Sequence, residues 1–241
     1  MNSQTTKKWL IKSLGLILFL FILWRIDEKH MLSILAQAEH KYIVIGLLLT
    51  IPLTLIKSIR WRKILKALGH EFPLDLSCLA YFAGQFWGLV SPARVGEFIK
   101  VRYLQAHKVS VIDGTFSVLL DRILDVISLF FIGALSLLFW EEKFEILPYL
   151  TIIILSALLL SVALVAFSLR NTFLDRLIKI VPEKLRIKIL EFLQGFRQNI
   201  ANICPRDYSH FFLYTLFGWV IYFLLAYFLA LALSIDLPFL T

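Results

Sequence analysis

Residues 91–125 of this chain read SPARVGEFIKVRYLQAHKVSVIDGTFSVLLDRILD. The stretch carries charges of both signs in a chain that is otherwise strongly apolar, since 59% of its 241 residues are hydrophobic and its mean hydropathy is +0.80. This composition is typical of an integral membrane protein. Charges inside a bilayer are costly and usually functional, so we predict a functional site at the charged residues expected at or within the membrane. The candidates are Arg94, Glu97, Lys100, Arg102, Asp121, Arg122 and Asp125.

Five segments are long and apolar enough, or nearly so, to cross a bilayer, which takes about 20 helical residues. They are residues 10–24, 42–56, 115–139, 147–169 and 211–235. The first follows Lys7 and Lys8, as a signal peptide would, but no cleavage site lies close behind its apolar part. We therefore predict that it stays in place as the first transmembrane helix.

A sixth apolar segment, residues 77–92, is short and interrupted by residues typical of irregular backbone. If it crossed the membrane, the basic residues on its two sides would face opposite compartments. If it enters and returns on one side, 20 Lys and Arg residues face the cytoplasm and 4 face outward, as the positive-inside rule favours. We expect a re-entrant segment, shaped by Gly84, Gln85, Gly88, Pro92 and Gly96. The Gly84-x-x-x-Gly88 spacing alone more often indicates close helix packing than function.

These observations predict an all-α fold: a polytopic membrane helical bundle with about five spanning helices and one re-entrant segment. The expected location is the cell (inner) membrane, with a cytoplasmic N-terminus. The net charge of +8 follows from this topology and does not indicate nucleic acid. The chain has no CxxC, HExxH or phosphate-loop motif, so we predict neither a metal nor another cofactor. Cys78 and Cys204 are expected in a reducing environment, where a disulfide is disfavoured.

Asp121 and Asp125 are four residues apart and share a helix face, with Arg122 close enough to pair with Asp125. Two carboxylates and one guanidinium leave one negative charge. Either a proton is held there or another cation completes the cluster, and Arg94 is the first candidate. The cluster has two interpretations: a structural ion network that fixes helix packing, or a polar pathway for a charged headgroup or a proton.

Apolar residues recur at helical spacing between positions 185 and 203, opposite a basic face. This pattern predicts an amphipathic helix that begins near Pro182. It could lie on an anionic lipid surface or dock on the bundle as an ordinary cytoplasmic helix.

Three groups of residues together resemble the transmembrane, flippase-type domain of the lysylphosphatidylglycerol synthase family. They are Gly84-Gln85-Phe86, the element Ser91-Pro92-Ala93-Arg94-Val95-Gly96-Glu97 with Lys100 and Arg102, and Asp121-Arg122 with Asp125. The resemblance spans about residues 42–235. It implies that residues 1–241 form a single flippase-like membrane domain, without the soluble aminoacyl-transferase domain. Such domains usually continue with further helices and a Gly-x-x-Glu element beyond the position of Thr241. We therefore expect a truncated gene product or a partner that supplies those helices.

Three functions follow from these features. The first is a lipid translocase, in which Arg94, Lys100 and Arg102 attract an anionic headgroup and the remaining charged candidates line a deeper path. The second is a non-transporting accessory protein of cell-envelope synthesis that binds a membrane-protein partner or a second copy of itself. The third, a lipid-modifying enzyme with Asp121 or Asp125 as base, is least favoured because no nucleophile or metal accompanies these carboxylates.

Overall fold

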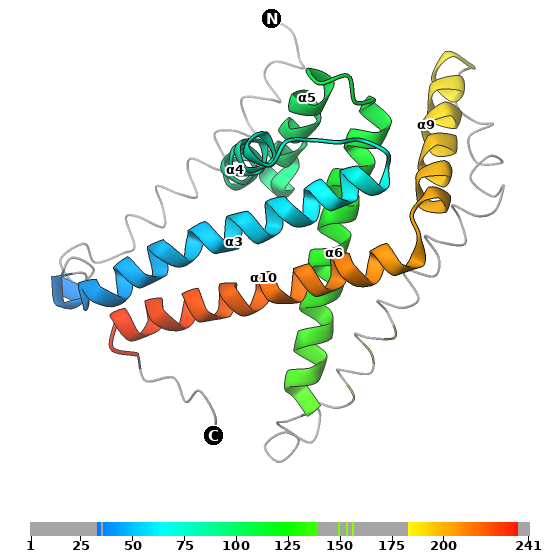
Figure 1. Cartoon of the computed structure of the whole chain (residues 1–241). Coiled ribbons are helices and arrows are strands. Elements are labelled where there is room, and N and C mark those ends of the chain that lie inside the picture. The colour runs from blue at the N-terminus through cyan, green and yellow to red at the C-terminus, as the bar shows by residue number, and fades with distance from the viewer. Residues whose placement is uncertain are drawn as a thin grey trace, which may run out of the picture. The chain divides into compact units, whose positions relative to one another are not determined.

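The computed structural model describes residues 33–138 apart from 35, residues 183–235, and the single positions 149, 153 and 156. Within these residues it is built of helices, without strands (Figure 1). The elements are α3 (His40–Ala67), α4 (Leu74–Val90), η1 (Pro92–Phe98), α5 (Ile99–Gln105), α6 (Val111–Leu138), α9 (Glu183–Asn202) and α10 (Pro205–Ala232). The predicted all-α class is confirmed for this part of the chain. The predicted crossing at 10–24, and all but three positions of the one at 147–169, lie outside it.

Two of the described helices, α3 and α10, are long and apolar enough to cross a membrane, judged by length and composition. Each has 28 residues, or about 42 Å at 1.5 Å per residue. Helix α6 has the same length but carries Asp121, Arg122 and Asp125 within it. The predicted number of about five crossings therefore stays a prediction.

Helix α3 extends further than the sequence predicts. The predicted crossing ends at residue 56, whereas α3 continues to Ala67 through a basic run. This run consists of Lys57, Arg60, Arg62, Lys63 and Lys66. The continuation is amphipathic: Trp61, Ile64 and Leu65 are fully buried, and the residues between them face outward. The turn after the helix is made at Gly69, whose φ of +86° lets the His70 amide donate to the Leu65 carbonyl at 2.9 Å, a common helix C-terminal turn.

Helix α4, η1 and α5 form an antiparallel hairpin, in which the chain runs out along α4 and returns beside it. Gly84 of α4 faces Lys100 of α5, and Gly88 faces Glu97 of η1. The tip is closed by the Gly96 amide, which donates to the Ser91 hydroxyl at 2.6 Å. A Cβ atom at Gly96 would overlap the Trp87 carbonyl, so the reversal requires glycine here.

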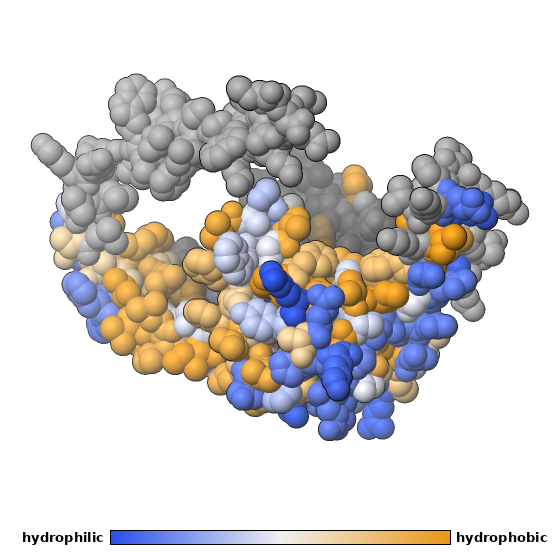
Figure 2. Space-filling model, turned by 90° about the horizontal axis from the view of Figure 1, so that it is seen from above, coloured by the Kyte–Doolittle hydropathy of each residue, from blue (hydrophilic) through white to orange (hydrophobic). Residues whose placement is uncertain are grey.

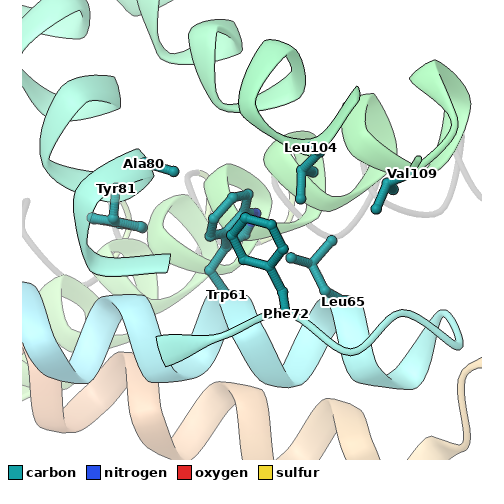
Figure 3. Packing of buried hydrophobic residues seen from close by; sticks show 7 residues of the cluster. All are labelled: Trp61, Leu65, Phe72, Ala80, Tyr81, Leu104 and Val109. Carbon is teal, nitrogen blue, oxygen red and sulfur yellow. The ribbon is translucent and has the colours of Figure 1, made fainter. Parts of the chain in front are cut away.

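Two buried clusters hold the hairpin and the long helices together. The first joins α3, α4, α5 and the loops before α4 and after α5 (Figure 3), and it consists of Trp61, Leu65, Phe72, Ala80, Tyr81, Leu104 and Val109. The second joins α3, α6 and the start of α10 and consists of Ile64, Phe116, Leu120, Leu124, Ile203 and Phe211. Both clusters use residues of the α3 extension, so the stretch after residue 56 is part of the protein core.

Helix α9 docks on the first turns of α6. The Phe196 and Phe116 rings meet edge to face with centroids 5.2 Å apart, and Gly195 lies against Ile112. The Asn199 amide donates to Asp113 at 2.8 Å. Of the two interpretations of this amphipathic segment, these contacts favour a helix docked on the bundle.

The chain divides into two compact units, residues 49–223 and the combination of 1–48 with 224–241. In the second, the start of α3 runs antiparallel to the end of α10: the Glu39 amide donates to the Ala232 carbonyl at 2.9 Å, and the Tyr42 and Phe228 rings are 6.2 Å apart. All residues of the candidate site lie in the unit formed by residues 49–223.

Candidate functional site

Arg60 of α3 occupies the centre of the site and is completely buried. Its Nε and Nη2 atoms donate to Asp121 Oδ1 at 2.9 and 2.6 Å, and Nη2 also reaches the Asp121 carbonyl at 3.3 Å. Its Nη1 atom donates to Asp125 Oδ1 and to Thr215 Oγ1, both at 2.7 Å. A guanidinium has five N–H donors, and all are used here. Arg60 thus ties α3, α6 and α10 together.

The remaining oxygens of the two aspartates contact other elements. Asp121 Oδ2 accepts hydrogen bonds from the Tyr81 hydroxyl of α4 at 3.2 Å and from Lys100 of α5 at 3.4 Å. Asp125 Oδ2 accepts one from Lys57 of α3 at 3.3 Å. We call the group of Lys57, Arg60, Tyr81, Asp121, Asp125 and Thr215 the Arg60 cluster.

The predicted completion of this cluster by Arg94 is wrong. The cation that reaches Asp121 and Asp125 is Arg60, supported by Lys57 and Lys100. The predicted pair of Arg122 with Asp125 is not formed either, because Asp125 is already bonded by Arg60 and Lys57. The 20 Lys and Arg residues expected on the cytoplasmic side include Arg60, whose side chain the fold buries completely.

A second group of charges surrounds Glu97, whose side chain is 3% exposed. Glu97 Oε1 pairs with Arg122 of α6 and lies 3.9 Å from Arg94 Nη1. Glu97 Oε2 lies 3.7 Å from Lys100 Nζ. We call Arg94, Glu97, Lys100 and Arg122 the Glu97 cluster. Lys100 also bonds Asp121, so it links this cluster to the Arg60 cluster.

The two clusters together carry an excess of positive charge. The four cations Lys57, Arg60, Lys100 and Arg122 meet three carboxylates, and Arg94 at the exposed edge adds a further cation. On the sequence alone, Asp121, Arg122 and Asp125 leave one negative charge, to be met by a held proton or by another cation. The excess is positive because four of these five cations come from α3 and the hairpin, outside the helix that carries the two aspartates.

The two glycines of α4 make room for charged side chains of η1 and α5, the returning half of the hairpin. A Cβ atom at Gly84 would come within 2.8 Å of Lys100 Cε, and one at Gly88 within 2.7 Å of Glu97 Cγ. Lys100 Nζ also lies over the Tyr81 ring, 3.9 Å from its centroid, a favourable position for a cation. The Gly84-x-x-x-Gly88 spacing therefore serves close packing. The side chains that pack against the two glycines, Lys100 and Glu97, are themselves candidate site residues.

The remaining predicted residues lie at the margin of the site. Arg102 is exposed and lines a surface pocket with Ile99, Tyr103 and Ala106, outside both clusters. Gln85 is half-buried on α4, and Pro92 is exposed at the start of η1. The structure therefore brings six of the seven predicted charged residues into one connected network and leaves out Arg102.

The outer face of α4, opposite its glycines, is apolar and exposed. Leu79, Phe82, Phe86 and Val90 repeat at helical spacing, and each is more than half exposed. Figure 2 shows broad hydrophobic areas across the face that it draws, with hydrophilic residues gathered toward one side. In water such a continuous apolar surface would be unfavourable, whereas in a bilayer it faces lipid.

Sequence reasoning missed four contributors to the site, namely Lys57, Arg60, Tyr81 and Thr215. One signal could have found Arg60. It lies on the same face of the amphipathic α3 extension as Trp61 and Ile64, and a charge on an apolar face predicts a buried partner. No comparable signal in the sequence marks Tyr81 or Thr215.

Comparison with known proteins gives two similar relatives. A UPF0104 membrane protein of Pyrococcus horikoshii is 26% identical over 97% of this chain and 77% of its own length. Glycosyltransferase AglD of Haloferax volcanii is 25% identical over 105 residues, which are 43% of this chain and 17% of that protein. No solved structure matches the chain. The sequence profile of the lysylphosphatidylglycerol synthase TM region matches residues 9–241, and the chain therefore belongs to this family of membrane proteins.

Proposed function

We propose that this membrane protein moves a lipid with an anionic headgroup between the two leaflets of the cell membrane. The observation that carries the proposal is the charged network between the hairpin and α6, which has surplus positive charge and lies behind an apolar outer face. A headgroup that follows the network stays among charged and polar side chains, while its acyl chains remain in the surrounding lipid. The activity is transport, without chemical change of the lipid.

In this proposal the hairpin of α4, η1 and α5 is the re-entrant segment. Charged groups and irregular backbone at membrane depth are tolerated when they are buried in protein or line a polar cavity. The hairpin meets this condition: its inner face holds Glu97 and Lys100, both buried, and its outer face is apolar. The N-terminus then faces the cytoplasm, and about five helices cross the membrane.

The path begins at the exposed edge of the Glu97 cluster. The side chains of Arg94 and Arg122 are 55% and 27% exposed, whereas Lys100 is completely buried. An anionic headgroup would therefore meet the two arginines first. Arg102, on the surface of α5, adds positive charge to the hairpin and attracts anions over a distance of about 8 Å at physiological salt.

The test is transbilayer movement of a fluorescent phosphatidylglycerol in liposomes that contain the purified protein. Wild type is compared with Arg122→Gln, which removes a charge of the entrance, and with Arg186→Gln, which removes an exposed charge of α9. We expect lipid movement by wild type and by Arg186→Gln. Movement by Arg122→Gln should be at least about tenfold slower, which corresponds to an activation free energy higher by about 1.4 kcal/mol. Folded wild-type protein that moves no more lipid than empty liposomes would contradict the proposal.

A further inference from the structure

The Glu97 cluster has the composition of an anion-binding site that its own carboxylate fills. One carboxylate lies among three cations: Arg122 pairs with Oε1, Arg94 Nη1 is 3.9 Å from Oε1, and Lys100 Nζ is 3.7 Å from Oε2. Lys100 is shared with Asp121, but both arginines have Glu97 as their only carboxylate partner among the described residues. The cluster therefore holds more positive charge than Glu97 can neutralise.

The hydrogen-bonding capacity of this cluster is also incompletely used. Glu97 Oε2 and Arg122 Nε are both buried, and neither makes a hydrogen bond within the described part of the chain. Arginine presents a planar fork of donors that suits phosphate as well as carboxylate. A phosphate group has more acceptor oxygens than a carboxylate, so it could engage the Arg122 donors and Arg94 at the same time.

The backbone at Arg94 provides a third observation. Its φ of +56° lies in the left-handed region, which is unfavourable for residues other than glycine, asparagine and aspartate. Strained backbone of this kind is concentrated at functional sites. Here the strain lies at the exposed cation that borders the cluster, where a glycine would form the same turn without strain.

We propose that Glu97 is a tethered substitute for the phosphate group of the ligand. When no ligand is bound, the Glu97 carboxylate occupies the space between Arg94, Lys100 and Arg122. A phosphate-bearing ligand displaces it and takes over these cations. That the phosphate belongs to a lipid headgroup rests on the proposed function, whereas the competition between Glu97 and an anion does not.

The decisive variant is Glu97→Gln, because removal of the competing charge strengthens anion binding. The purified protein in neutral detergent is titrated against a fluorescent phosphatidylglycerol, with inorganic phosphate as competitor. We expect Glu97→Gln to bind the lipid at least about tenfold more tightly than wild type, since one like charge at contact distance is removed. The matched control is Glu71→Gln, the same change at an exposed position of the loop before α4, which should bind as wild type does.

Competition with inorganic phosphate distinguishes a site for a free phosphate ion from a site for the phosphate of a lipid headgroup. Displacement of the lipid from Glu97→Gln by inorganic phosphate would show that a free anion suffices. Resistance to inorganic phosphate would show that the rest of the lipid contributes to binding. A folded Glu97→Gln protein that binds phosphatidylglycerol no more tightly than wild type would overturn the inference.

A second variant decides the matter if Glu97→Gln does not fold. Arg94→Gly keeps the positive φ and removes one cation, so we expect an intact fold and severalfold weaker lipid binding; unchanged binding would overturn the inference.

These binding measurements are independent of transport. Tighter binding by Glu97→Gln without lipid movement by any form would support the tethered carboxylate and reject translocation. Movement by wild type with unchanged binding by Glu97→Gln would reject only the tethered carboxylate.

Discussion

The Arg60 cluster and the Glu97 cluster are linked by Lys100, which contacts both Glu97 and Asp121, but they satisfy their charges differently. Every N–H donor of Arg60 has an acceptor, and the cluster connects α3, α4, α6 and α10. In the Glu97 cluster, buried polar atoms of Glu97 and Arg122 have no hydrogen bond within the described residues, and two arginines reach the surface. Complete pairing indicates a structural role, and incomplete pairing at an accessible edge indicates a place for a ligand.

This difference bears on the two interpretations of the charged residues in α6. Asp121 faces the Arg60 cluster and fits a structural ion network. Arg122, the next residue, faces the Glu97 cluster and fits a polar pathway. Because neighbouring residues of a helix point in directions about 100° apart, one helix can supply both roles, and we propose that the two interpretations apply to different faces of α6.

The largest effect is expected from Arg60→Met, which tests whether the Arg60 cluster is structural. Removal of the guanidinium leaves Asp121 and Asp125 buried without their main partner, so we expect a loss of about 3 to 5 kcal/mol in the free energy of unfolding. Unfolding in detergent, followed by circular dichroism, measures it. Lys66→Met, at an exposed cation of the same helix, should stay within about 0.5 kcal/mol of wild type. A stable Arg60→Met protein that no longer moves lipid would place Arg60 in the pathway and break the comparison.

A smaller effect is expected from Gly88→Ala, which tests the packing of the Glu97 cluster. The new methyl group would meet Glu97 Cγ, so Glu97 must move, and we expect a loss of about 1 to 3 kcal/mol from overpacking. Gly133→Ala is the matched control, since nothing lies within 4 Å of a Cβ atom at that position of α6. Equal stability of the two variants would show that the Glu97 side chain moves aside at little cost and that α4 does not fix its position.

Tyr81→Phe sharpens the comparison by removing a single hydrogen bond from the Arg60 cluster. The ring under Lys100 is kept and the donor to Asp121 Oδ2 is lost, so we expect about 1 kcal/mol lower stability and unchanged lipid movement. Tyr222→Phe, at a ring that is 47% exposed, should leave the stability within about 0.5 kcal/mol of wild type. Lost transport by a stable Tyr81→Phe protein would contradict a purely structural Arg60 cluster.

The smallest effect concerns Asp113, which joins α9 to α6 ahead of the predicted crossing. Burial by itself raises the pKa of Asp113, but hydrogen bonds from Asn199, His70 and Ser110 outweigh it and lower the pKa. The ionised form therefore stabilises the fold above the unfolded-state pKa of about 3.9, and this contribution is lost as the pH falls through the lower folded-state pKa. Thermal unfolding of wild type and Asp113→Asn across this range measures it. An unchanged difference between the two proteins at every pH would contradict the assignment.

The sequence located the charged residues well and their partners poorly. The shared face of Asp121 and Asp125 is correct because four-residue spacing on a helix is a local property. The partner of both, Arg60, lies 61 positions before Asp121, and local spacing contains no information on such a pair. The basic run was interpreted through the positive-inside rule, which concerns averages over a loop and does not identify the one arginine that turns inward.

By itself, the sequence indicated the class of the protein, its family, close packing at Gly84 and Gly88, and the set of charged residues, although α4 runs unbroken from Leu74 to Val90 through both glycines. These follow from hydropathy, glycine content and helical spacing, which depend on near neighbours in the chain. Only the tertiary structure decided which charges neutralise each other, that the surplus is positive, and that Glu97 rather than Asp125 faces Arg122. Electrostatic pairing depends on distances in space, and these are set by how the hairpin, α3 and α10 pack around α6.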